Sequence, residues 1–129
     1  MVTLFWWSLV FGSSGEGASG SWTAKLLADW FGLSGNALEL TNFVVRKAGH
    51  VSYYGILTAL IAWSLFGFVF ACRLRSVAAA SLLALGTGVF DEVRQAQFDS
   101  RTGTPIDLIY DSAGIVLAVI VFLRLTRGK

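Results

Sequence analysis

The sequence is poor in cysteine, proline and histidine, with one of each in 129 residues. A single cysteine excludes an intrachain disulfide. We interpret Cys72, which follows the longest apolar run, as a small residue at a helix end rather than a lipidated or reactive thiol. Charged residues make up only 14% of the chain, against about 25% in a typical soluble domain. The net charge of +2 comes from scattered basic residues, which indicates no nucleic-acid partner.

Apolar residues are abundant instead, at 55% of the chain, and the mean hydropathy is +0.67. A soluble fold of this length cannot hide so much apolar surface in its core, whereas a lipid bilayer acts as an apolar solvent. We therefore predict an all-α, polytopic integral membrane helix bundle in which residues 1–129 form one domain. Residues 1–11 have no basic start and no A-x-A-like cleavage site, so we do not interpret them as a signal peptide.

Two apolar runs in the middle of the chain predict membrane crossings. Val51–Ala71 holds 21 residues without a charge. As a helix it covers about 31 Å, close to the hydrocarbon thickness of about 30 Å. Ser76–Phe90 has only 15 such residues and covers about 22 Å. To cross, this second helix must carry Asp91, Glu92 and Gln95 into the membrane interface, where charges are costly unless they face protein or water.

A further crossing is predicted at Ile106–Leu123. Thr104 suits the N-cap of this helix and Pro105 its first turn. Asp107 and Asp111 lie in its first turns, and the first of them favours the helix macrodipole.

The N-terminal part predicts two further membrane-associated segments. Val2–Phe11 is too short to span alone, so we interpret it as a short first crossing, with an interfacial helix or a missing upstream piece as alternatives. Gly12–Gly20 reads as a flexible loop. Trp22–Leu33 has apolar residues at helical spacing and favours an amphipathic helix in the extracytoplasmic headgroup region. The total is about four crossings and one interfacial helix.

A capping-box pattern precedes the first long apolar run. Asn36-x-x-Glu39 predicts the start of a helix that either runs into Val51–Ala71 or meets it at a bend near Gly49.

Basic residues predict the orientation. Arg73 and Arg75 lie on the same predicted side as the C-terminal Arg124, Arg127 and Lys129, and by the positive-inside rule that side is the cytoplasm. The opposite side also holds five basic residues, but it carries all eight acidic ones. We therefore predict a cytoplasmic C-terminus.

Polar residues near the crossings form two groups on this opposite side. Lys47, His50 and Tyr54 share one helix face at spacings of three and four residues, although Lys and Tyr are also ordinary membrane anchors and a lone histidine is often structural. The second group consists of Asp91, Glu92, Gln95, Arg101, Asp107 and Asp111.

Small residues indicate which of these acids face other helices. Ala80, Ala84 and Gly88 form a stripe that Glu92 continues, which aims this carboxylate into the bundle. Arg101 is a candidate partner for the carboxylates, because a buried charge needs one.

Three roles are compatible with carboxylates beside one histidine. The first role is binding of a divalent cation. A single nitrogen ligand makes a weak zinc site, so we predict neither a metal nor another cofactor. The second role is acid/base chemistry on a lipid headgroup. The third is a charge-paired network that either shapes a binding cleft or only holds the helices together.

In these residues the chain resembles the VanZ-like family of small bacterial membrane proteins. The first matching block is Arg46-Lys47-Ala48-Gly49-His50, followed by Tyr54 and Leu57. The second is Asp91-Glu92-Val93-Arg94-Gln95, followed by Arg101, Asp107, Asp111 and Gly114; Ser13-Ser14 also fits. The chain departs from the family at Tyr53, where many members carry Glu, and at Asp111, where many carry Asn.

The resemblance implies a protein of the bacterial cytoplasmic membrane, and the family's namesake is associated with resistance to the glycopeptide teicoplanin. We expect an extracytoplasmic polar cleft that engages a membrane lipid, a lipid-linked cell-wall intermediate or a lipoglycopeptide. Lys47 and Arg101 would meet anionic headgroups. The ligand-binding candidates are Arg46, Lys47, Tyr54, Gln95, Arg101, Asp107 and Asp111. In the enzymatic alternative, the catalytic candidates are His50, Glu92 and Asp91.

Overall fold

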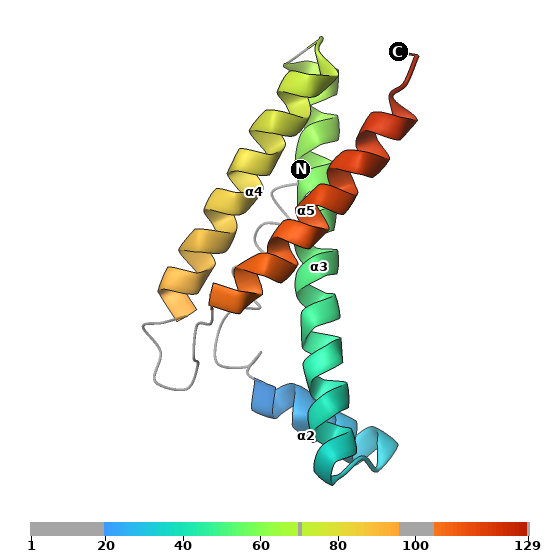
Figure 1. Cartoon of the computed structure of the whole chain (residues 1–129), viewed down its shortest axis with the longest axis vertical. Coiled ribbons are helices and arrows are strands. Elements are labelled where there is room, and N and C mark those ends of the chain that lie inside the picture. Colours follow the sequence, from blue (N-terminus) through green and yellow to red (C-terminus); the bar gives the residue numbers. More distant parts are fainter. Residues whose placement is uncertain (1–19, 70, 96–104, 129) are drawn as a thin grey trace.

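The computed structural model describes residues 20–69, 71–95 and 105–128, which are all-helical and contain no strand. The helices are α2 (Gly20–Phe31), α3 (Gly35–Phe68), α4 (Arg73–Gln95) and α5 (Pro105–Leu125) (Figure 1). The predicted first crossing at Val2–Phe11 and residues 12–19 of the predicted loop lie outside the described residues.

Helix α3 joins two predicted segments into one. It runs without a break past Gly49 for 34 residues, or about 51 Å, and ends at Phe68 rather than Ala71. The predicted capping box at Asn36 is wrong, because the N-cap is Ser34 and its side chain makes no capping hydrogen bond. The start is set by the connection from α2, where Gly32 and Gly35 adopt φ values of +65° and +56° that only glycine takes up freely.

Helix α2 ends two residues earlier than the predicted Leu33. The Gly32 N–H donates to the Ala28 carbonyl oxygen at 2.9 Å, and the left-handed backbone at Gly32 then ends the helix.

Helices α3, α4 and α5 are each long and apolar enough to cross a membrane, and the chain is membrane-embedded. Helix α4 has 23 residues and α5 has 21, so they cover about 34 Å and 31 Å. Since α4 extends beyond Phe90, it carries Asp91 and Glu92 in its last turns, as predicted. Helix α5 begins at Pro105, which confirms the predicted start.

The bundle core lies where α4 packs on both α3 and α5. One buried cluster consists of Tyr54, Leu57, Ala84 and Ile115. The next, further along the bundle, consists of Ala62, Val77, Ala80 and Phe122. Ala80 and Ala84 are fully buried and Gly88 is also buried, so the predicted small-residue stripe does face neighbouring helices.

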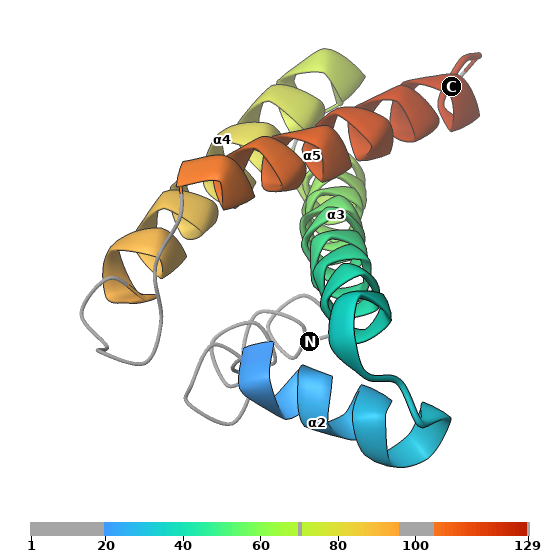
Figure 2. The same cartoon turned by 60° about the horizontal axis from the view of Figure 1, so that its bottom comes forward.

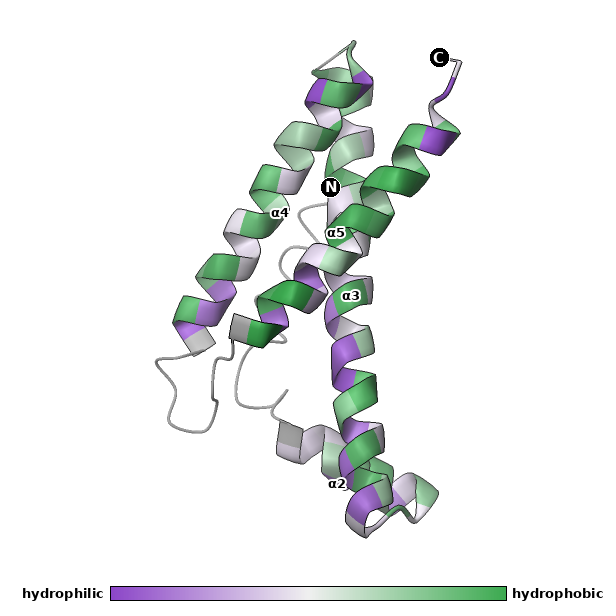
Figure 3. Ribbon diagram, viewed as in Figure 1, coloured by the Kyte–Doolittle hydropathy of each residue, from purple (hydrophilic) through white to green (hydrophobic). Residues whose placement is uncertain are grey.

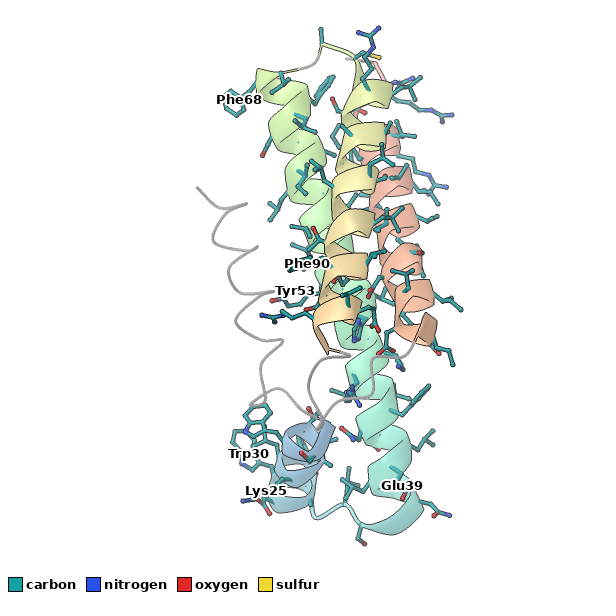
Figure 4. The ribbon with its side chains drawn as sticks, turned by 90° about the vertical axis from the view of Figure 1, so that its left-hand side faces the viewer. Lys25, Trp30, Glu39, Tyr53, Phe68 and Phe90 are labelled. Atoms are coloured by element: carbon teal, nitrogen blue, oxygen red, sulfur yellow. The ribbon has the colours of Figure 1, made fainter. Side chains whose placement is uncertain are left out.

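Helix α3 extends well past the lower ends of α4 and α5, and α2 lies crosswise at its far end (Figures 1 and 2). Figure 4 places Glu39 on this extension, whereas Tyr53 and Phe90 lie level with the lower part of α4. Helix α2 leaves Trp22, Trp30 and Phe31 exposed. A crosswise helix with exposed aromatic side chains has the form expected of an interfacial helix.

Candidate functional site

Hydrophilic residues gather at the lower ends of α4 and α5 and on the adjoining part of α3 (Figure 3). We call this the polar cluster; its described members are Lys47, His50, Tyr54, Asp91, Glu92, Asp107 and Asp111. It forms because α3 and α5 cross there, which brings residues about 60 positions apart into contact.

Lys47 and Asp107 form an ion pair between α3 and α5. Both side chains are sheltered, with 14% and 3% of their surface exposed. The Lys47 ammonium also lies 5.3 Å from the centre of the Phe43 ring and 5.1 Å from that of Tyr110. Lys47, expected to meet an anionic headgroup, is therefore already neutralised by a carboxylate of its own chain.

His50 and Asp111 form a second contact between the same helices, one turn deeper. The His50 Nδ1 atom lies 2.8 Å from Asp111 Oδ1, and Asp111 is buried. The other ring nitrogen, Nε2, lies 3.9 Å from Asp107 Oδ2. The histidine is thus held between two carboxylates, which fixes the orientation of its ring.

Tyr54 lies one further turn along α3. Its side chain is only 2% exposed, and its hydroxyl has no hydrogen-bond partner among the described residues. The carboxylates of Asp111, Asp91 and Glu92 lie within electrostatic range of this hydroxyl. A buried hydroxyl without a partner costs about 1–3 kcal/mol, so it is a feature that a bound group would relieve.

Gly88 lets α4 pack closely against the Tyr54 ring and Asp111. A Cβ at this position would lie 3.3 Å from Asp111 Oδ2 and 3.5 Å from Tyr54 Cε1. The missing side chain thus lets the three helices come close together beside Tyr54.

The two acidic residues of α4 differ in their surroundings. Asp91 is 7% exposed, and Arg94 lies 3.7 Å from it, one turn along the helix. Glu92 is half-buried, and no ion pair reaches it in the described part of the chain. Sequence reasoning identified both acids but missed Arg94 as a partner, although the i,i+3 spacing was a usable signal.

The remaining candidates contribute less to the observed geometry. Arg46 is half-buried beside Lys47. The side chain of Gln95 and all of Arg101 lie outside the described residues. The described residues bring no three His, Cys, Asp or Glu side chains together in a way that would hold a metal ion.

An apolar groove of about 400 Å³ lies along the seam between α3 and α5. It is lined by Ser52, Ile56, Trp63, Leu117 and Val121 among others. None of the polar cluster residues lines it, so the groove and the cluster are separate features.

The arrangement divides into two chemical parts. The Lys47–Asp107 and His50–Asp111 pairs join α3 to α5, and their charges largely satisfy one another. Tyr54 and Glu92 instead present groups that the described residues leave unpaired. The Tyr54 hydroxyl and the Glu92 carboxylate are therefore the polar groups of the cluster that stay open to a further partner.

Comparisons with protein-family models, with curated proteins and with solved structures find no match to this chain.

Proposed function

We propose that this chain is a VanZ-like protein of the bacterial cytoplasmic membrane whose polar cluster binds the polar head of a membrane amphiphile. The observation that carries the proposal is the buried Tyr54 hydroxyl, which lacks a partner among the described residues and lies among carboxylates. Buried polar groups in folded proteins are otherwise nearly always hydrogen-bonded. Ionisable residues at membrane depth also mark functional sites more often than structural ones.

The position of the cluster supports an amphiphile as the ligand. It lies at one end of α4 and α5, where helices of about 31–34 Å reach the headgroup region. A polar head at that depth belongs to a molecule whose apolar part remains in the bilayer. Membrane lipids, lipid-linked cell-wall intermediates and lipoglycopeptides such as teicoplanin all have this form, and the VanZ-like resemblance favours a cell-envelope ligand.

Replacing the Tyr54 hydroxyl tests this proposal. We expect Tyr54→Phe in the full chain to co-purify with less bound lipid by native mass spectrometry. Its stability to thermal unfolding in detergent should equal or exceed that of wild type, because no described residue depends on the hydroxyl and its burial without a partner is costly. Tyr110→Phe is the matched control: it removes the same atom from a half-buried tyrosine of α5. Unchanged lipid content in Tyr54→Phe, or loss of stability alone, would contradict the proposal.

A structural role for part of the cluster is favoured by the Lys47–Asp107 pair. Lys47→Ala leaves a buried carboxylate without its cation, and we expect it to lower the free energy of unfolding by about 3 kcal/mol. Thermal unfolding in detergent measures this loss. The clasp and the binding role are compatible, because they use different residues.

Catalysis is a second candidate function, favoured by the 2.8 Å contact that orients His50 against Asp111. In this mechanism His50 acts as the base and Glu92 as the acid on a lipid headgroup. Loss of function in His50→Ala with lipid binding retained would support it, and parallel loss of both would favour the binding role.

A further inference from the structure

We propose that the head bound beside Tyr54 carries an ammonium group rather than only a phosphate, an inference that rests on the proposed function and specifies its ligand. The cluster contains four carboxylates, and the described cations in contact with them are Lys47 and Arg94. Each of these cations already faces a carboxylate, Asp107 and Asp91 respectively. Four carboxylates against two cations leave a negative charge, whether His50 is neutral or protonated.

The unpaired negative charge lies close to the unpaired hydroxyl. Glu92 has no ion-pair partner in the described chain and lies within electrostatic range of Tyr54, Asp107 and Asp111. Oxygen Oδ2 of Asp111 and the Tyr54 ring both border Gly88, while Oδ1 of Asp111 contacts His50. A cation near Tyr54 would thus meet carboxylate charge from both α4 and α5.

The groups beside the Tyr54 hydroxyl match the hydrogen-bonding pattern of an ammonium. A primary ammonium has three donors and no acceptor, and carboxylate oxygens and a tyrosine oxygen are acceptors. The negative charge of the nearby carboxylates also favours a cation electrostatically. An anionic head without an ammonium would instead bring like charges together in a sheltered site, where repulsion is weakly screened.

The ammonium can belong to a lipid head or to a free amine, and one binding experiment separates the two. Full-length wild-type protein in detergent is titrated with phosphatidylethanolamine and with phosphatidylglycerol of identical acyl chains, followed by native mass spectrometry. These lipids share the phosphate and differ in the ammonium. We expect phosphatidylethanolamine to bind about tenfold more tightly or better, as for a charge-assisted hydrogen bond. Free ethanolamine is then added as a competitor.

The variants assign the preference to a residue. Glu92→Gln keeps the size of a half-buried side chain. It should reduce the ratio of the two lipid affinities, phosphatidylethanolamine over phosphatidylglycerol, to about one. Glu39→Gln, on the exposed extension of α3, makes the same change away from the cluster and should leave the preference intact. Displacement by ethanolamine would show that the ammonium suffices, whereas no displacement would assign recognition to the whole lipid. Either result, with the preference for phosphatidylethanolamine, supports the inference.

Other outcomes overturn it. Equal or tighter binding of phosphatidylglycerol, lost in Tyr54→Phe, would contradict the ammonium while leaving the proposed binding function intact. A preference that persists in Glu92→Gln would also contradict the charge argument. If neither lipid binds wild type better than Tyr54→Phe, the proposed function itself fails.

Discussion

Two glycines bring the backbones of α3 and α5 into direct contact. An added Cβ at Gly114 would overlap the Val51 carbonyl oxygen and approach the Gly55 nitrogen to 3.0 Å. A Cβ at Gly55 would meet the Gly114 carbonyl oxygen at 3.2 Å. Small residues of this kind let membrane helices approach closely. The contact lies one turn from the His50–Asp111 pair, so it also sets the spacing within the polar cluster.

We expect Gly114→Ala to destabilise the bundle by about 1–3 kcal/mol, because the backbones must separate to admit the methyl group. Gly86→Ala in α4 is the matched control, since a Cβ there meets nothing within 4 Å. It should be neutral or stabilising by up to about 1 kcal/mol. Thermal unfolding in detergent, followed by circular dichroism, compares the two. Equal stability of both variants would show that the close approach of α3 and α5 is not required.

The start of α4 gives Cys72 a particular environment. The backbone N–H groups of Arg75 and Leu74 donate to the Cys72 sulfur, and with the charges of Arg75 and Arg73 they lower the pKa of this exposed thiol. Cys72 thus occupies the N-cap position of α4, outside the membrane-spanning helices. It lies at the start of α4 and not at the end of the preceding apolar helix, because α3 already ends at Phe68.

This environment predicts a measurable pH dependence. A lowered pKa means that the reactive thiolate of Cys72 persists at pH values where an ordinary thiol, with a pKa of about 8.5, is largely protonated. As the pH is lowered, the rate of maleimide labelling should therefore begin to fall at a lower pH for Cys72 than for a reference cysteine. Arg127→Cys in a Cys72→Ser background supplies that reference at an exposed position near the same end of the bundle. Coincident pH profiles would refute the N-cap effect.

The molecule has two chemically different ends. Arg73, Arg75, Arg124 and Arg127 lie at the end that holds the α3–α4 connection and the C-terminus (Figure 1). The described acidic residues instead lie between α2 and the lower turns of α4 and α5. This separation supports the proposed orientation, with the arginine end in the cytoplasm.

Labelling of intact cells tests this orientation. A membrane-impermeant maleimide should leave Cys72 unreacted, because Cys72 lies at the arginine end. Glu39→Cys in a Cys72→Ala background should react, since residue 39 is exposed on the far extension of α3. Permeabilised cells, in which both should react, control for accessibility. The reverse pattern would place the polar cluster on the cytoplasmic side.

Sequence alone determined that the chain is helical and membrane-embedded, because long apolar runs need lipid and helices satisfy their own backbone hydrogen bonds. It also identified Lys47, His50, Tyr54 and the acids of α4 and α5, since charges beside apolar runs are rare. Only the tertiary structure decided which of these residues pair. The Lys47–Asp107 and His50–Asp111 contacts depend on how α3 and α5 cross at Gly55 and Gly114. Helical periodicity fixes the faces of one helix but not its partner, and that partner determines which polar groups stay open to a ligand.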